Sequence, residues 1–180
     1  MTISDQAKEA IARVLEEGET AIDATMGNGW DTVFLAETVG PSGKVLAFDV
    51  QEAALKKTDK RLERAGVRER CQLVHQGHET MGEHVSGGVG AVMFNLGYLP
   101  YADRSVITTE GTTLRALQTA REILRPGGVI AIICYRGHPG GQDEARAVWQ
   151  WVLAQSESLQ VDAPKDFPVG DGPFLLALTK

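Results

Sequence analysis

Apolar positions along the chain switch repeatedly between two spacings. The opening residues keep helical spacing, with apolar side chains at Ile3, Ala7, Ala10, Ile11, Val14 and Leu15. Short apolar runs typical of buried strands then recur at residues 20–25, 44–49, 71–75, 89–94, 129–135, 159–163 and 174–180. Further helical patterns occur at about residues 30–39, 51–66, 105–124 and 142–155. The alternation predicts an α/β protein, built as one domain over residues 1–180.

Alternating strands and helices predict a mostly parallel sheet with helices on both faces. The run at 129–135 is almost wholly apolar, as expected of a central strand that is covered on both sides. No helical pattern separates 159–163 from 174–180, so these strands are expected to pair as an antiparallel hairpin at the C-terminus. The sequence thus predicts a Rossmann-like sheet of seven strands.

Right-handed crossovers place the carboxyl ends of parallel strands at one edge of the sheet, where open α/β sheets bind ligands. The residues that follow the first five strands should therefore meet there: 23–29, 49–51, 76–78, 95–100 and 135–141. This edge is where candidate chemistry is expected.

A glycine-containing turn, Gly27-Asn28-Gly29, joins the first strand to its helix. A dinucleotide site would have a third glycine, but Thr32 fills that slot, and Asp31 would repel a pyrophosphate. An acidic residue beside the loop favours a cationic ligand instead. S-adenosylmethionine carries a sulfonium and an ammonium, so the pattern favours it as the cofactor.

Polar residues after the second and third strands fit the rest of such a cofactor. Asp49 ends the second strand, where an acid accepts hydrogen bonds from a ribose diol, and Gln51 should lie near the same ribose. His78 is placed to cap the adenine. Asp23 is a further candidate in the loop. Plainer alternatives stay open: Asp49 as a helix N-cap, Asp23 as a residue that orders the loop, and His78 as a solvated loop residue.

Asn95 and Tyr98, in the stretch "NLGY" after the fourth strand, resemble the Asn/Asp-Pro-Pro-Tyr/Phe motif of enzymes that methylate exocyclic nitrogens. In that motif an amide oxygen and a backbone carbonyl hold the amine, and the ring stacks on the base. If the amine arrives as an ammonium, Asp31, His138 or water would take the proton. Arg136, after the fifth strand, would meet a phosphate or lie as a plain surface charge.

Composition narrows the class of protein. The chain has 180 residues and a net charge of −6, which argues against a protein that coats nucleic acid nonspecifically. A local basic segment remains, typical of a solvated helix face: Lys56, Lys57, Lys60, Arg61, Arg64, Arg68 and Arg70. No signal peptide or membrane span is expected, and Cys71 and Cys134 fit buried free thiols in a cytoplasmic protein. The spacing of histidines and cysteines matches no zinc site.

Several motifs occur in an order that resembles one family: "DATMGNGWDTVFLA", "FDVQ", "GH" at 77–78, "FNLGYLP" and "YRGHPGG". They resemble the small bacterial proteins called putative rRNA methylases, a group associated with methylation of 5-aminomethyl-2-thiouridine at the tRNA wobble position. The resemblance implies a class I S-adenosylmethionine-dependent methyltransferase with a seven-stranded sheet, a homodimer, and the tRNA anticodon stem-loop as partner. It also implies that Asn28, Asp49, Gln51, His78 and Asn95 serve the cofactor or active site, with Tyr98 and His138 near the substrate. Trp30 and Gly77 depart from the residues usual in the family.

Four functions are therefore weighed. The first is an N-methyltransferase of the tRNA wobble uridine, and the second is a methyltransferase of rRNA or of a small amine. The third is a nicotinamide-dependent oxidoreductase, against which the missing third glycine and Asp31 argue. The fourth is a non-catalytic binding module, against which the intact "NLGY" argues.

Overall fold

A computed structural model describes residues 1–97 and 108–180. The strands are β1 (Thr20–Asp23), β2 (Lys44–Phe48), β3 (Cys71–Val74), β4 (Val89–Leu96), β5 (Leu124–Cys134), β6 (Gln160–Asp162) and β7 (Phe174–Thr179). The α-helices are α1 (Ile3–Ala12), α2 (Trp30–Val39), α3 (Glu52–Ala65), α4 (Glu110–Ile123) and α5 (Gly141–Ala154). Two 3₁₀-helices, at Arg68–Arg70 and His78–Glu83, flank β3.

The strands form a seven-stranded sheet in the order β3-β2-β1-β4-β5-β7-β6. The first five strands run parallel, and β7 pairs antiparallel with both β5 and β6. The predicted α/β fold with a C-terminal antiparallel pair is confirmed. Because β1 pairs with both β2 and β4, the strand order reverses at β1, and a crevice opens at the carboxyl ends beside such a point.

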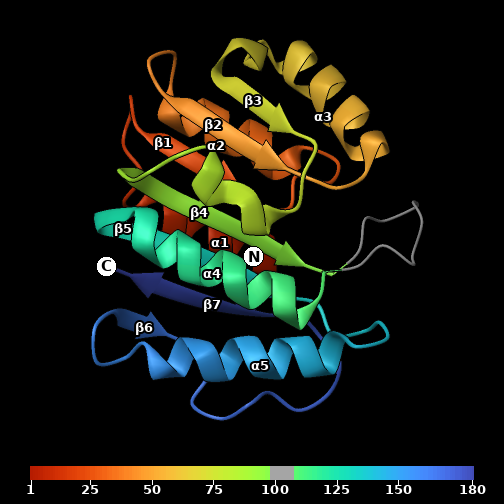
Figure 1. Ribbon diagram of the computed structural model, residues 1–180, viewed down its shortest axis with the longest axis vertical. Coiled ribbons are helices and arrows are strands. Elements are labelled where there is room, and N and C mark those ends of the chain that lie inside the picture. Colours follow the sequence, from red (N-terminus) through yellow and green to blue (C-terminus); the bar gives the residue numbers. More distant parts are fainter. Residues whose placement is uncertain (98–107) are drawn as a thin grey trace.

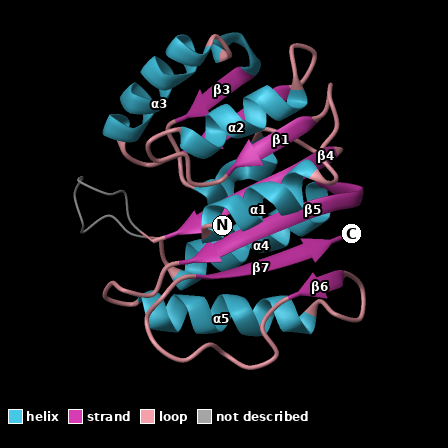
Figure 2. Cartoon of the chain, turned by 180° about the vertical axis from the view of Figure 1, so that it is seen from behind, coloured by secondary structure: helices cyan, strands magenta, loops and turns pink. Residues whose placement is uncertain are grey.

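Helices cover both faces of the sheet, α4 and α5 on one and α1 and α2 on the other (Figures 1 and 2). Successive side chains of a strand point to opposite faces of the sheet, so β4 contributes to the core on each face. Val92 and Phe94 belong to the core under α4 and α5, whereas Ala91 and Met93 belong to the core under α1 and α2. A strand buried on both faces must be apolar, which explains the run at 89–94, before Asn95 reaches the edge of the sheet.

Local signals set several element boundaries. Thr2 and Asp5 form a reciprocal capping box at the start of α1, and Gly66 ends α3 in a left-handed conformation with φ of 70°.

Cys71 and Cys134 are buried free thiols, as predicted. Within the described ranges, no helix combines the length and apolarity that crossing a bilayer requires.

Two boundaries differ from the prediction. The described part of the helix expected at 105–124 begins only at Glu110, after the extended N-cap Thr109. The "RPGG" stretch, expected to separate that helix from the next strand, lies inside β5, where the pairing with β4 shifts register. A bulge accommodates these residues because Gly127 takes φ of 74° and donates its N–H to the carbonyl of Lys180.

Candidate active site

A cavity of about 710 Å³ opens at the carboxyl edge of the sheet, beside the point where the strand order reverses. Residues after β1, β2, β3 and β4 form most of its wall, as the topology predicts. Residues of α1 and the start of α4 complete it, among them Ser4, Lys8, Thr109 and Thr112. Asp49 and Asn95, from opposite sides of β1, therefore share one cavity.

The glycine loop after β1 is held close to α3. Gly27 and Gly29 have φ of 51° and 80°, and a Cβ on Gly29 would lie 2.8 Å from the hydroxyl oxygen of Thr58. That hydroxyl donates to the carbonyl of Gly27 at 3.2 Å, and the Arg61 Nε donates to the carbonyl of Asn28 at 2.7 Å. The loop needs glycine both for its backbone conformation and for this close approach. Gly27 and Asn28 line the cavity; Gly29 packs behind it.

Asp49 presents a carboxylate to the cavity. Its Oδ2 accepts the N–H of Gly27 at 3.1 Å, and its Oδ1 accepts the N–H of Gln51 at 2.9 Å. Burial raises the pKa of Asp49 above its usual value, and these hydrogen bonds oppose the rise. The N-cap of α3 is Gln51, so Asp49 is not the helix cap. A carboxylate has about four acceptor sites, so two remain for hydroxyl donors from a ligand.

Asp23 lies beneath this loop, fully buried, and does not line the cavity. It accepts the hydroxyl of Thr32 at 2.6 Å and the N–H of Thr25 at 3.2 Å, so it orders the loop. Burial raises the pKa of Asp23 to about 7, and the negative charges of Asp31 and Asp49 add to the rise. These charges give the region a negative potential that suits a cationic ligand.

His78 is buried at the cavity wall and is not a solvated loop residue. Its Nδ1 lies 3.2 Å from the carbonyl of Ala24, and its ring packs edge-on against Phe94. Because a carbonyl only accepts, Nδ1 carries the proton and donates. Burial lowers the pKa of His78, which favours the neutral ring with an acceptor nitrogen at Nε2.

Asn95 is fixed by residues of two other elements. Its backbone N–H donates to the Thr25 hydroxyl at 2.7 Å, and its side-chain Nδ2 donates to Oδ2 of Asp31 at 2.5 Å. The other oxygen of Asp31, Oδ1, lies 3.0 Å from Nζ of Lys8 on α1. Since a carboxylate only accepts, the NH₂ of Asn95 must face Asp31. The side-chain carbonyl oxygen of Asn95 therefore points away from Asp31, and Asn95 lines the cavity.

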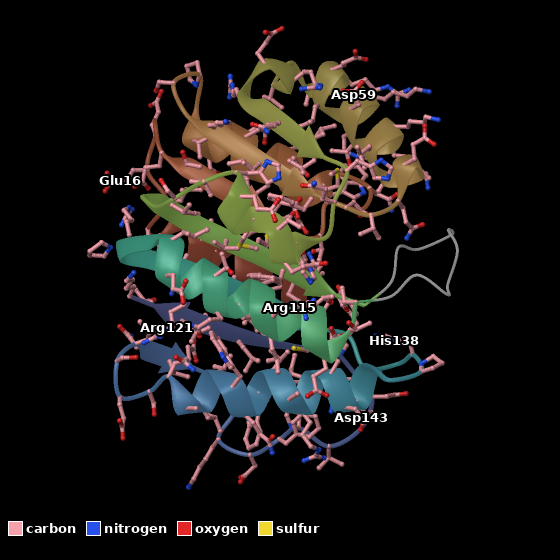
Figure 3. The ribbon with its side chains drawn as sticks, in the orientation of Figure 1. Glu16, Asp59, Arg115, Arg121, His138 and Asp143 are labelled. Carbon is pink, nitrogen blue, oxygen red and sulfur yellow. The ribbon has the colours of Figure 1, made fainter. Side chains whose placement is uncertain are left out.

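The other predicted site residues lie as follows. Asp31 and Gln51 line the cavity. His138, on the loop between β5 and α5 (Figure 3), does not line it; a Cβ on Gly97 would lie 3.6 Å from its Nε2. Tyr98 lies outside the described residues.

Arg136 is neither a phosphate ligand on the surface nor a plain surface charge. It is buried, and its guanidinium donates to the carbonyls of Gly172 and Pro168. It also packs over the rings of Phe167 and Phe174. Arg136 therefore ties the segment before β7 to the end of β5. Its neighbour Tyr135 is the residue that lines the cavity.

Sequence reasoning missed the contribution of α1. Lys8 forms its ion pair with Asp31 from α1, a helix that packs against β5 and β7, whereas α2, which carries Asp31, packs against β1 and β2. A lysine on an amphipathic helix carries no local signal of such a contact. Trp30, noted only as a departure from the family, lies at the cavity mouth with 63% of its surface exposed.

The cavity fits S-adenosylmethionine. Asp49 keeps acceptor sites for a ribose diol, as described above, and the exposed Val50 offers apolar surface for an adenine. The Asp49 carboxylate, which has no cationic side chain paired with it among the described residues, suits the positive charges of the cofactor. The residues that were predicted to hold it, Asp49, Gln51 and His78, all line the cavity.

Comparison with known proteins decides the family. The family model described as "Putative rRNA methylase" matches residues 45–162. The chain belongs to the putative rRNA methylase family. Two solved structures resemble it over nearly their whole lengths. A putative rRNA methylase from Clostridium thermocellum has 35% identity and a TM-score of 0.92, covering 99% of this chain and 97% of that one. A putative methyltransferase from Streptococcus mutans, solved with S-adenosylhomocysteine, has 38% identity and a TM-score of 0.86, covering 99% and 98%.

One curated relative of this chain is named for a wobble-position nucleotide of tRNA. The chloroplastic tRNA (mnm(5)s(2)U34)-methyltransferase of Arabidopsis thaliana is 43% identical over 146 residues, which cover 76% of this chain. The match spans only about half of that relative, 53% of its length. Together the comparisons confirm the predicted enzyme class, an S-adenosylmethionine-dependent methyltransferase of the RNA-methylase type, and its cofactor.

Proposed function

We propose that this protein methylates an exocyclic primary amine of RNA, the aminomethyl nitrogen of 5-aminomethyl-2-thiouridine at the tRNA wobble position. The Arabidopsis relative, named for the mnm(5)s(2)U34 position of tRNA, supports this acceptor. So does the resemblance of "NLGY" to motifs that hold exocyclic amines.

The observation that carries the proposal is the fixed amide of Asn95. Asp31 takes its NH₂ group, so the carbonyl oxygen is the part of the side chain left for a substrate. That oxygen accepts one N–H of the acceptor amine and thereby sets the direction of the nitrogen lone pair. Orientation of this kind accounts for a large share of catalysis when two groups must meet in line.

Asp31 acts in this scheme as a positioning residue. Both of its oxygens are engaged, one by Lys8 and one by Asn95, so we infer that it orients the amide and does not act as a general base. An amine that arrives neutral needs no base before the transfer. For an amine that arrives protonated, His138 or water stays the candidate acceptor.

The cofactor side of the cavity holds the methyl donor. When bound, S-adenosylmethionine supplies a methyl carbon made electrophilic by its positively charged sulfur. Asp49 and Gln51 bind the ribose and His78 borders the adenine, while Gly27 and Asn28 offer backbone that a ligand can approach closely.

Further parts of the proposal rest on the family resemblance. We propose the tRNA anticodon stem-loop as the partner, a homodimer of one-domain subunits as the working assembly, and the cytoplasm as its location. Light scattering of the purified protein tests the dimer directly, and a monomeric mass at working concentrations would remove it.

One alternative has an observation behind it. The description of the matching family names rRNA, so an rRNA amine is the second candidate acceptor. A small amine metabolite remains the candidate suggested by the acidic net charge of −6.

Nucleoside mass spectrometry separates these acceptors. We expect tRNA from a strain without this gene to accumulate the 5-aminomethyl nucleoside, and the purified protein with S-adenosylmethionine to convert it. An Asn95→Ala protein serves as the inactive control. Unchanged wobble uridines in the deletion strain would remove the tRNA assignment, and a lost rRNA methyl group would replace it.

A further inference from the structure

A second groove, of about 430 Å³, lies directly beside the cofactor cavity. Lys57, Lys60, Arg61 and Arg64 line it from α3, together with Asn28 and Trp30. Residues spaced three, four and seven apart share one face of a helix, so the four cations form a single row. The acidic protein therefore carries a concentrated positive strip at this place.

Within the described ranges, none of the four cations forms an ion pair with a carboxylate. Among the described residues that line the groove, none is acidic. Two carboxylates of α3 pair with other cations: Glu52 with Lys56, and Asp59, seen on α3 in Figure 3, with Arg68. Lys57, Lys60 and Arg64 are exposed, so their charges face solvent. Such a strip attracts a polyanion.

Trp30 joins the groove to the cavity. It lines both hollows, as does Asn28. The guanidinium of Arg61 lies 3.3 Å from the centre of the indole ring and also donates to the carbonyl of Asn28. The arginine thus holds the tryptophan in place while most of its surface remains exposed. A fixed, exposed aromatic ring beside cations is a platform for a nucleic-acid base.

We propose that this groove binds the phosphate backbone of the RNA that presents its nucleotide to the cavity, with an RNA base stacking near Trp30. The proposal rests on the proposed function, because it takes RNA as the acceptor. From Lys57 to Arg64 the helix rises about 10 Å, which matches roughly three nucleotides of a strand. A row of cations with an aromatic platform beside it suits RNA better than an acidic protein, which would offer no base to stack.

Two double variants with the same change of charge test the groove. Lys60→Gln with Arg64→Gln removes two cations of the row and spares Arg61, which holds the cofactor loop. Lys56→Gln with Arg13→Gln removes two exposed cations that lie outside the groove. Each protein is titrated with an unmodified tRNA anticodon stem-loop at several salt concentrations, and with S-adenosylhomocysteine by calorimetry.

We expect the groove variant to bind the stem-loop roughly 10-fold or more weakly at 0.1 M salt, with its salt slope reduced by about 1.5, because two phosphate contacts are lost. The control variant should stay within about threefold of the parent. Both should bind S-adenosylhomocysteine as the parent does. Trp30→Leu should weaken RNA binding without changing the salt slope, since stacking releases no counterions.

The outcomes separate the groove from the proposed function. If the parent binds the stem-loop and both double variants bind it equally well, the groove proposal is overturned while the proposed function stands. If the parent binds S-adenosylhomocysteine but no RNA at low salt, both are overturned. A parent that binds polyaspartate as tightly as RNA of the same charge would assign the groove to an acidic protein instead.

Discussion

Main-chain N–H groups fix the carboxylate on the β1–β2 side of the cavity, whereas two side chains fix the amide on the β4 side. On the first side, the N–H groups of Gly27 and Gln51 fix Asp49. On the second side, Asn95 depends on Asp31 from α2, and Asp31 in turn on Lys8 from α1. The β1–β2 side therefore forms when the loop after β1 packs against β2 and α3. The β4 side needs, in addition, that α1 and β4 pack beside α2.

The comparison implies that the two sides can be damaged separately. A change on the β4 side should reduce turnover and leave cofactor affinity almost intact. A change on the β1–β2 side should do the reverse. The predictions that follow run from the largest expected effect to the smallest.

Asn95→Ala should lower turnover about 100-fold or more, because the acceptor amine loses the oxygen that orients it. Its affinity for S-adenosylhomocysteine should stay within about threefold of the parent. Methyl transfer under saturating cofactor and calorimetry measure the two quantities. Asn28→Ala is the matched change on the other side and should affect affinity more than turnover; full activity in Asn95→Ala would exclude the orienting role.

Asp31→Asn should lower turnover roughly 10- to 100-fold, because Asn95 can then turn its amide either way. As a positioning residue, Asp31 should affect the rate equally across the pH range, so the pH profile keeps its shape. Lys8→Met, which removes only the second partner of Asp31, should have a milder effect. If a rise in pH restored the rate of Asp31→Asn, Asp31 would instead be a proton acceptor.

Asp49→Asn should weaken cofactor binding about 10-fold, since hydrogen bonds to a charged acceptor contribute about 1.5–3 kcal/mol and the charge is lost. Turnover at saturating cofactor should change little. Asp49→Ala should weaken binding further, because the N–H groups of Gly27 and Gln51 then lose their acceptor. Equal affinity of all three proteins in calorimetry would contradict a role for Asp49 in the ribose site.

Asp23 should make the stability of the fold depend on pH. Its pKa rises from 3.8 to about 7 on folding, so the folded protein holds this proton more tightly than the unfolded chain. The stabilisation is fully present below pH 3.8 and is lost as the pH rises through about 7. Asp23→Asn keeps the shape of the side chain and removes its titration. In urea denaturation, the free energy of unfolding of this variant should therefore fall less across this pH window than that of the parent, with a difference of a few kcal/mol at most. Identical pH dependence in both proteins would mean that Asp23 does not titrate there.

Much of the fold could be predicted because its signals are local. Each strand is a short apolar run and each helix has its own period, so the order of elements and the antiparallel end followed from the pattern. The errors came where tertiary contacts decide. The glycines of "RPGG" indicate a break in any sequence, yet here they form a bulge against the last residue, Lys180. The sequence indicated either a phosphate contact or a plain surface charge for Arg136, but Phe167 and two carbonyls from the segment before β7 enclose it.

The sequence by itself determined which residues meet at the carboxyl edge, because parallel strands with right-handed crossovers leave little choice of topology. Asp49, His78 and Asn95 could be placed there from their positions after strands. Only the tertiary structure decided what these residues do with one another. Asp23 became a buried support, Asp31 became the partner of Asn95 and Lys8, and the basic residues of α3 became one wall of a groove. Roles of this kind depend on distances between elements far apart in the chain, and those distances are set by the packing of helices on the sheet.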